Sequence, residues 1–168
     1  MICHVIGNLL DADCDYICHQ VNCQGRMGSG IAKSIKERWP IVYDQYVNGY
    51  KEREKEISNM CTFEYSLDVG ETLLGHLQQV KVNNKQTVIN MFAQQYYGYD
   101  GQRYTSYDAF WDCLEGIAAS VPKGSKIGFP YGIGCGLGGA NWKIIETMIE
   151  QVLAADYDIY IYHFHQED

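Results

Sequence analysis

The chain has 168 residues, of which 46% are hydrophobic and 20% are charged. This length suits one domain over 1–168 with a full hydrophobic core, and it is short for two. No segment approaches the roughly 18 consecutive apolar residues of a membrane span, and the N-terminus lacks a signal-peptide pattern, so we expect a cytoplasmic protein without membrane contact.

The formal net charge is −8, and the basic residues are interspersed with acidic ones, as in KEREKE at 51–56. A nucleic-acid-binding surface usually presents a basic field, so the charge argues against a nucleic-acid partner. The negative charge also means that any bound phosphate must be held by local donors. Backbone N–H groups in a glycine-rich turn or at a helix N-terminus would serve.

The seven cysteines are an odd number, and a domain of this size is stable without disulfides, so we expect reduced thiols. Cys14, Cys18, His19 and Cys23 lie close enough in sequence to suggest a zinc site. Zinc is nevertheless disfavoured, because no CxxC pair occurs and strand alternation would place Cys18 and His19 on opposite faces. We expect neither a metal nor another cofactor.

The first half of the chain predicts two strands followed by two helices. The strands lie at 1–6 and 15–21, and a glycine-rich stretch then leads into a helix that starts near Ser29 and stops before Pro40. The apolar face of a second helix consists of Val42, Tyr46, Val47 and Tyr50. No period is evident over 57–71, which we expect to be a loop.

The second half predicts four strands and two helices. Strands at 73–82 and 87–93 flank the turn NNK, and a helix from Ser106 ends at Pro122 and Gly124. A strand at 126–129, a helix whose apolar face includes Trp142 and Ile145, and a strand at 159–164 follow. Strands interleaved with helices predict an α/β fold, a three-layer α/β/α sandwich around a mixed central sheet.

A glycine-rich loop stands twice between a strand and a helix, in HQVNCQGRMGSGIAKSI and in FPYGIGCGLGGANWKII. Glycine lets the backbone approach a ligand closely, so successive amides can converge on an anion. Ligands of open α/β sheets usually bind beyond the carboxyl ends of the strands, and two such loops could grip two linked phosphates there. The alternative is that the glycines only form tight turns. Neither loop matches the P-loop or the Rossmann pattern.

The segment NCQGRMGSGIA resembles the first ligand loop of macro domains, and GIGCGLGG resembles their second. The strand order agrees, and the likeness covers nearly the whole chain. Macro domains bind ADP-ribose, so the resemblance implies that ADP-ribose or a related nucleotide is the ligand of this chain. We expect the protein to be a monomer.

The resemblance also implies ligand contacts. Gly28–Ala32 would meet one phosphate at the helix N-terminus, and Gly134–Leu137 would cover the other phosphate and the distal ribose. Asn8 would accept a hydrogen bond from the adenine amino group, and Phe164 would stack on adenine or else be buried in the core. The ligand-binding residues expected on this basis are Asn8, Asn22, Gln24, Met27, Gly28, Ser29, Gly30, Ile31, Ala32, Gly132, Ile133, Gly134, Cys135, Gly136, Leu137 and Phe164.

Two further groups of polar residues have two interpretations each. Asn22 and Gln24 would bind the distal ribose or cap the turn. Arg103 and Tyr104, in a tyrosine-rich stretch, would close over a terminal phosphate or belong to an ordinary surface loop. Cys135 has no adjacent base in the sequence, so a thiolate nucleophile is not expected.

The chain is similar to the subgroup that contains ADP-ribose-1''-phosphatases and glutamate-ADP-ribose hydrolases. The hydrolases use a lysine and an aspartate where this chain has MFAQQ and Gly138, which argues against a lysyl adduct. His19 lies where the phosphatases have a histidine and is the candidate catalytic acid or base, although Asn141 replaces their acid and a core role for His19 is the alternative.

The resemblance implies hydrolysis of the terminal phosphate of ADP-ribose-1''-phosphate by this chain. The alternatives are a non-catalytic ADP-ribose-binding module and a hydrolase of protein-linked ADP-ribose or O-acyl-ADP-ribose.

Overall fold

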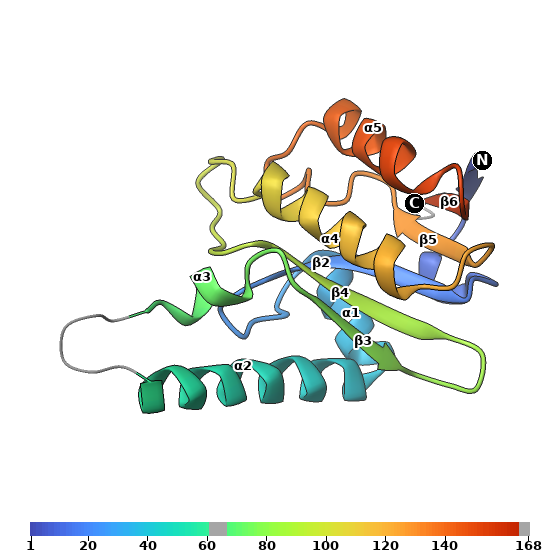
Figure 1. The fold of residues 1–168 in the computed structure, drawn as a ribbon. Coiled ribbons are helices and arrows are strands. Elements are labelled where there is room, and N and C mark those ends of the chain that lie inside the picture. The colour runs from blue at the N-terminus through green and yellow to red at the C-terminus, as the bar shows by residue number, and fades with distance from the viewer. Residues whose placement is uncertain (61–66, 165–168) are drawn as a thin grey trace.

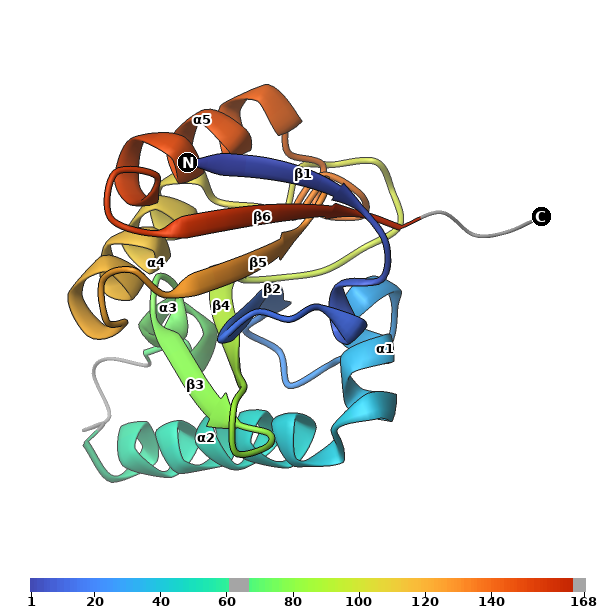
Figure 2. The same ribbon diagram turned by 90° about the vertical axis from the view of Figure 1, so that its right-hand side faces the viewer.

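A mixed six-stranded sheet in the order β1-β6-β5-β2-β4-β3 forms the centre of the computed structural model, which describes residues 1–60 and 67–164. The strands are β1 (Ile2–Ile6), β2 (Tyr16–Asn22), β3 (Leu77–Lys81), β4 (Thr87–Gln94), β5 (Lys126–Pro130) and β6 (Asp158–His163). Neighbouring strands are parallel, except that β3 and β4 form an antiparallel hairpin. Figure 2 shows β1 and β3 at the two edges. The predicted α/β fold with a mixed sheet is confirmed.

Helices cover both faces of the sheet. They are η1 (Leu9–Asp11), α1 (Gly30–Arg38), α2 (Pro40–Met60), α3 (Val69–Leu73), α4 (Tyr107–Ser120) and α5 (Trp142–Leu153). Figure 1 shows α4 and α5 on one side of the sheet and α1 and α2 on the other. Each side has its own apolar core: Phe110, Leu114 and Ile145 are fully buried on the first side, and Ile35, Val42 and Tyr46 on the second.

The expected break between the first two helices lies at Trp39 and Pro40. Trp39 caps α1, and its N–H donates to the Ile35 carbonyl at 2.8 Å. Pro40 is the first residue of α2. Proline is tolerated there because the N–H of the first helical residue has no acceptor within the helix. Val42 and Tyr46 are fully buried on the predicted apolar face of α2.

The two largest differences from the sequence-based expectation lie over 57–71 and at the start of β3. The loop expected over 57–71 is partly helical, because α2 continues to Met60 and the Asp68 side chain caps α3 by accepting a hydrogen bond from the Gly70 N–H at 2.7 Å. Residues 61–66 lie outside the described residues. The strand expected from Leu73 starts only at Leu77, since α3 ends at Leu73 and Gly75 (φ 89°) turns the chain.

The strand order brings the two glycine-rich loops to one edge of the sheet. Strand β2 lies between β5 and β4 and runs parallel to both. The carboxyl ends of parallel strands meet at the same edge. The loops that follow β2, β4 and β5 therefore converge there, although they are far apart in sequence.

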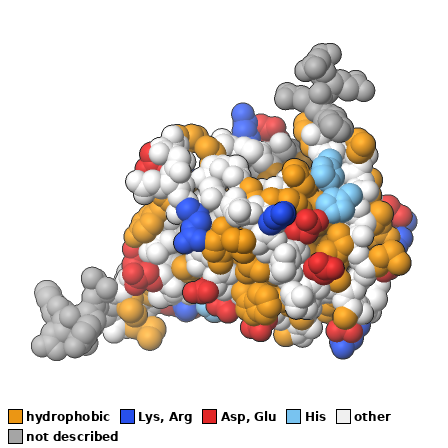
Figure 3. All heavy atoms as spheres, turned by 90° about the horizontal axis from the view of Figure 1, so that it is seen from above, with side chains coloured by type: hydrophobic (Ala, Val, Ile, Leu, Met, Phe, Trp, Pro, Cys, Tyr) orange, Lys and Arg blue, Asp and Glu red, His pale blue; other side chains and the backbone are white. Residues whose placement is uncertain are grey.

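Two properties of the structure bear on possible partners. Lysine and arginine side chains are scattered on the face shown in Figure 3 rather than gathered into a basic field. In addition, the helices within residues 1–60 and 67–164 are all too short or too polar to cross a membrane.

Candidate functional site

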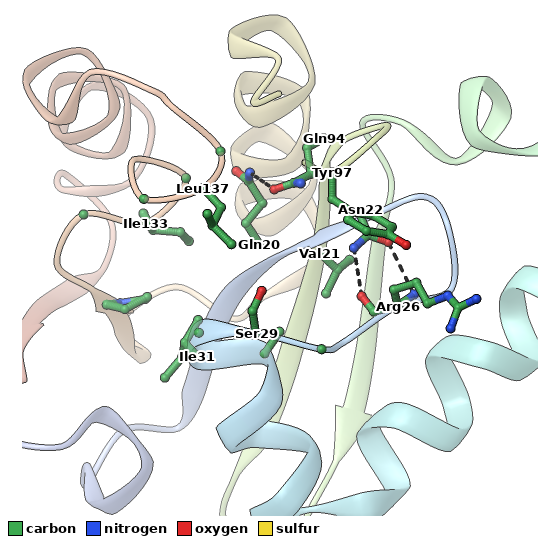
Figure 4. A pocket seen from close by; sticks show the side chains of 18 of the residues that line it. Gln20, Val21, Asn22, Arg26, Ser29, Ile31, Gln94, Tyr97, Ile133 and Leu137 are labelled. Carbon is green, nitrogen blue, oxygen red and sulfur yellow. Dashed lines mark hydrogen bonds between the residues drawn. The ribbon is translucent and has the colours of Figure 1, made fainter. Parts of the chain in front are cut away.

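A cleft of about 520 Å³ opens between the two glycine-rich loops (Figure 4). This volume is within the range of ~300–1,000 Å³ that is typical of small-molecule sites. Its walls come from the loops after β2, β4 and β5 together with the start of α1. The lining residues are Gln20, Val21, Asn22, Arg26, Gly28, Ser29, Gly30, Ile31, Ala32, Gln94, Tyr97, Gly98, Tyr99, Pro130, Tyr131, Gly132, Ile133, Gly134, Gly136, Leu137 and Gly138.

The first glycine-rich loop presents unpaired amides at the N-terminus of α1. Ser29 is the N-cap residue in an extended conformation, and its side chain makes no capping hydrogen bond. The N–H groups of Gly30, Ile31 and Ala32 belong to the first turn, which has no intrahelical acceptor. They donate to no other described residue either. An anion at this point would gain three backbone donors and the positive end of the helix dipole.

The second glycine-rich loop presents a second group of unpaired amides. Its path is set by internal hydrogen bonds, such as those from the Cys135 N–H to the Gly132 carbonyl at 2.8 Å and from the Ala140 N–H to the Gly134 carbonyl at 2.9 Å. Positive φ angles of 74° at Gly132 and 75° at Gly134 make these turns possible. Within the described chain, the N–H groups of Gly134, Gly136, Leu137 and Gly138 donate no hydrogen bond.

The Tyr46 side chain of α2 anchors the first glycine-rich loop. Its buried hydroxyl lies 2.8 Å from both the carbonyl and the side-chain oxygen of Asn22, and it accepts a hydrogen bond from the Arg26 N–H at 3.0 Å. Asn22 Oδ1 also accepts from the Gln24 N–H at 3.0 Å, and Gln24 Nε2 donates to the Gln95 carbonyl at 3.1 Å. Asn22 and Gln24 therefore hold the turn, and of the two only Asn22 lines the cleft.

No protein-family model matches the chain. Two curated proteins named DNA ADP-ribosyl glycohydrolase, from Mycobacterium tuberculosis (strain ATCC 25618 / H37Rv) and Mycobacterium bovis (strain BCG / Pasteur 1173P2), are each 37% identical to it over 71 residues. The matched segment covers 42% of this chain and only 19% of the length of either relative.

Solved structures match nearly the whole chain. A Bacteroides thetaiotaomicron protein of unknown function is 25% identical with a TM-score of 0.74, and the match covers 97% of this chain and 98% of that one. The macrodomain of Mycobacterium tuberculosis DarG is 24% identical with a TM-score of 0.70 over 96% of this chain and 97% of that one. The chain has the macrodomain fold. Thermosipho africanus DarTG, solved in complex with ADP-ribose, is 18% identical with a TM-score of 0.70, and the match covers 95% of this chain and 41% of that one.

Within this fold, His19 is a core residue rather than a cleft residue. Its side chain is fully buried and does not line the cleft, which favours the alternative of a core role over contact with a ligand. Burial lowers the pKa of His19 to about 4, although the hydrogen bond with Asn90 acts in the opposite direction. In this structure the His19 imidazole is therefore neutral near pH 7 and lies outside the cleft.

The hydrogen bonds of neighbouring amides fix the His19 tautomer. Gln78 Nε2 donates to the Gln45 carbonyl at 2.7 Å, and Gln78 Oε1 accepts from Asn90 Nδ2 at 2.9 Å. Asn90 Oδ1 must then accept from His19 Nε2. The proton is on Nε2, and Nδ1 is left as a buried acceptor without a partner among the described residues. This chain of hydrogen bonds ties β2 to β4, β3 and α2.

Four other predicted ligand residues lie outside the cleft lining. The Asn8 side chain caps η1 by accepting from the Leu10 N–H at 3.0 Å, and Met27 is buried in the core between β2 and α2. Cys135 packs against the opposite core, and burial raises the pKa of its thiol. Phe164 is 67% exposed, so the alternative of core burial is wrong, and its stacking on adenine stays a prediction.

The structure brings the remaining predicted ligand residues together around the cleft. They are Asn22, Gly28, Ser29, Gly30, Ile31, Ala32, Gly132, Ile133, Gly134, Gly136 and Leu137.

Sequence reasoning missed part of the cleft. Tyr97 and Tyr99 line it, whereas Arg103 and Tyr104 do not: the Arg103 guanidinium lies 4.5 Å from the Tyr107 ring centroid, and the Tyr104 hydroxyl donates to Asp100 at 2.8 Å. The tyrosine-rich stretch indicated that this segment forms a wall of the site, but the sequence did not show which of its side chains face the cleft. No comparable sequence pattern indicated that the cleft is also lined by Gln20, Arg26, Gln94 and Tyr131.

The absence of an acid from the second loop has a steric reason. A Cβ at Gly138 would collide with Thr105 Oγ1 and with the backbone carbonyl of Gly134. Among the described lining residues, Arg26 has the only side chain that is charged at neutral pH, and the others include no histidine, lysine, cysteine or carboxylate. Nor do the described residues contain a histidine, cysteine and carboxylate cluster suited to a metal ion.

Proposed function

We propose that the cleft binds ADP-ribose or an ADP-ribose derivative through its diphosphate. The observation that carries this proposal is that two sets of unpaired backbone N–H groups line one cleft. One set lies in Gly30–Ala32 at the start of α1, and the other lies within Gly134–Gly138 in the second loop. Each set can neutralise one phosphate without a charged side chain. This mode of binding suits a protein whose net charge is −8.

The comparisons support the ADP-ribose part of the ligand. Thermosipho africanus DarTG shares the fold and was solved with ADP-ribose. The cleft also has an apolar end formed by Ile31, Ala32, Pro130 and Tyr131, which suits a flat base.

Hydrolysis at the distal ribose is a second candidate function, and it is favoured by the named activity of the curated relatives. Removal of the terminal phosphate of ADP-ribose-1''-phosphate is the form of hydrolysis that the macro-domain resemblance implies. Because the described lining contains no group that titrates near neutral pH, binding stands ahead of either reaction.

Calorimetric titration with ADP-ribose tests the binding proposal. We expect saturable one-to-one binding to the wild-type chain. Gly136 lines the cleft, its φ is not positive, and an added Cβ would meet no atom within 4 Å. The variant Gly136→Val should therefore fold normally, and its side chain should fill the space that a phosphate would occupy. Its affinity for ADP-ribose should fall at least about tenfold, which corresponds to ~1.4 kcal/mol.

Ala119→Val on the exposed face of α4 is the control, since it adds apolar bulk outside the cleft. Equal thermal unfolding of both variants and weaker binding by Gly136→Val alone would support the proposal. Absence of ADP-ribose binding to the wild-type chain would refute it. Parallel assays with ADP-ribose-1''-phosphate, ADP-ribosylated protein, O-acyl-ADP-ribose and ADP-ribosylated DNA test the hydrolytic candidate.

A further inference from the structure

Gln20 lies on β2 at the base of the cleft and is only 9% exposed. Its Nε2 donates two hydrogen bonds of 2.8 Å each, to Gln94 Oε1 and to Thr105 Oγ1. Figure 4 shows the side chains of Gln20 and Gln94 in contact beside the second glycine-rich loop. Gln20 therefore joins β2, β4 and the segment before α4.

The partners of Gln20 determine which way its amide faces. Gln94 Nε2 donates to the Tyr96 carbonyl at 2.9 Å, so Gln94 Oε1 is left as an acceptor. Thr105 Oγ1 donates its only proton to the Gly134 carbonyl at 2.8 Å, so it too can only accept from Gln20. Both contacts require the NH₂ group, and a flipped amide would place oxygen against two acceptors.

The remaining atom, Gln20 Oε1, is a buried acceptor with no partner among the described residues. A Cβ built on Gly134 would lie 2.8 Å from it, so the absence of a side chain at Gly134 leaves space beside this oxygen next to the glycine-rich loop. Leaving a buried oxygen unpaired is unfavourable, and a donor on a ligand would relieve that cost.

The strand order separates the cleft into two ends. Gln20, Asn22 and Gln94 lie at the carboxyl ends of β2 and β4 and make a polar end, whereas Pro130 and Tyr131 lie at the carboxyl end of β5 on the other side of β2. If the apolar end takes the adenine base, as proposed above, the sugar beyond the diphosphate reaches the polar end.

We propose that Gln20 is a specificity-determining residue whose Oε1 accepts a hydrogen bond from a hydroxyl of the distal ribose. The inference rests on the proposed binding of ADP-ribose. An ionised diphosphate offers only acceptors, so the sugar hydroxyls are the donors available near this oxygen. A fully ionised phosphate in the same place would face an acceptor, and the cleft thus favours a hydroxyl-bearing group there.

Calorimetric titrations of the wild-type chain and Gln20→Met with ADP-ribose and with ADP test this inference. Methionine keeps the length of the side chain and removes both the acceptor and the NH₂ group that donates to Gln94 and Thr105. Loss of the NH₂ contacts should weaken both ligands alike, whereas loss of the acceptor should weaken ADP-ribose by a further fivefold to tenfold or so (about one hydrogen bond), because ADP lacks the distal ribose. Equal losses for the two ligands, or no loss for ADP-ribose, would overturn the assignment.

Thr105→Val separates recognition from support of the loop. It removes the link to the Gly134 carbonyl but keeps Gln20 Oε1, so any loss should be the same for ADP-ribose and ADP. If Gln20→Met unfolds, 2''-deoxy and 3''-deoxy analogues of ADP-ribose test the wild-type chain directly: one of them should bind more weakly than ADP-ribose, and equal affinities would overturn the inference. Failure of the wild-type chain to bind ADP-ribose at all would instead refute the proposed function on which the assignment rests.

Discussion

His19 and Gln20 are neighbours on β2, and their side chains point to opposite faces of the sheet. Strand alternation directs His19 into the core beside α2 and Gln20 into the cleft. The sequence showed that adjacent residues face opposite sides, as it did for Cys18 and His19. It could not show which side of β2 leads to the ligand, because that depends on how the loops after β4 and β5 close.

The enclosed His19 predicts a specific loss of stability in acid. Its pKa in the folded chain is about 4, below the ordinary value of 6.5, so the unfolded chain binds the proton first. This contribution to stability is complete above pH 6.5, falls as the pH drops from 6.5 to 4 and is lost below 4, a change of about 3 kcal/mol.

Urea unfolding of the wild-type chain and His19→Gln at pH 7 and pH 4.5 measures this effect. The variant can still donate to Asn90 but does not titrate, so the wild-type chain should lose more stability than the variant between the two values. Parallel losses would show that His19 is not held neutral in the folded chain.

At the scale of elements, the start of α1 is held in place by α2. Tyr46 is fully buried, and its hydroxyl bridges Asn22 at the start of the first loop and the Arg26 N–H in the middle of it. The amides that face the cleft thus depend on a helix that does not itself line it. The spacing of apolar residues identified Tyr46 as a core residue but could not reveal the use of its hydroxyl.

Replacement of Tyr46 by phenylalanine tests this anchor. The change keeps the packing and removes the hydroxyl, so stability should fall by about 1–2 kcal/mol, with a parallel loss of ADP-ribose affinity as the loop loosens. Urea unfolding and calorimetry measure the two quantities. Tyr43→Phe is the control, because the Tyr43 hydroxyl makes no hydrogen bond within the described residues. Equal behaviour of the two variants would argue against the anchor.

Two regions show where local sequence patterns were insufficient. Five residues of α3 are too few to display a helical period, and its cap at Asp68 is a single side chain. The wall formed by Tyr97 and Tyr99 depends on long-range contacts of the loop after β4, so the sequence indicated its composition but placed Arg103 and Tyr104 there instead. By contrast, both glycine-rich loops were identified, since glycine spacing is a local property.

For the whole molecule, neutral amides bind an anion within an acidic protein whose net charge is −8. Added salt screens the repulsion between protein and ligand and removes little attraction. The affinity for ADP-ribose should therefore stay within about twofold, or rise, from low to physiological ionic strength. Calorimetry across a salt series measures this, and a steep loss of affinity with salt would show that charged side chains dominate binding.

Amide chemical shifts during an ADP-ribose titration test the central claim most directly. In ¹H–¹⁵N spectra, the largest shifts should belong to the N–H groups that are unpaired in the two loops, Gly30, Ile31, Ala32, Gly134, Gly136, Leu137 and Gly138. Saturable binding whose largest shifts lie elsewhere, with these amides unchanged, would contradict the account.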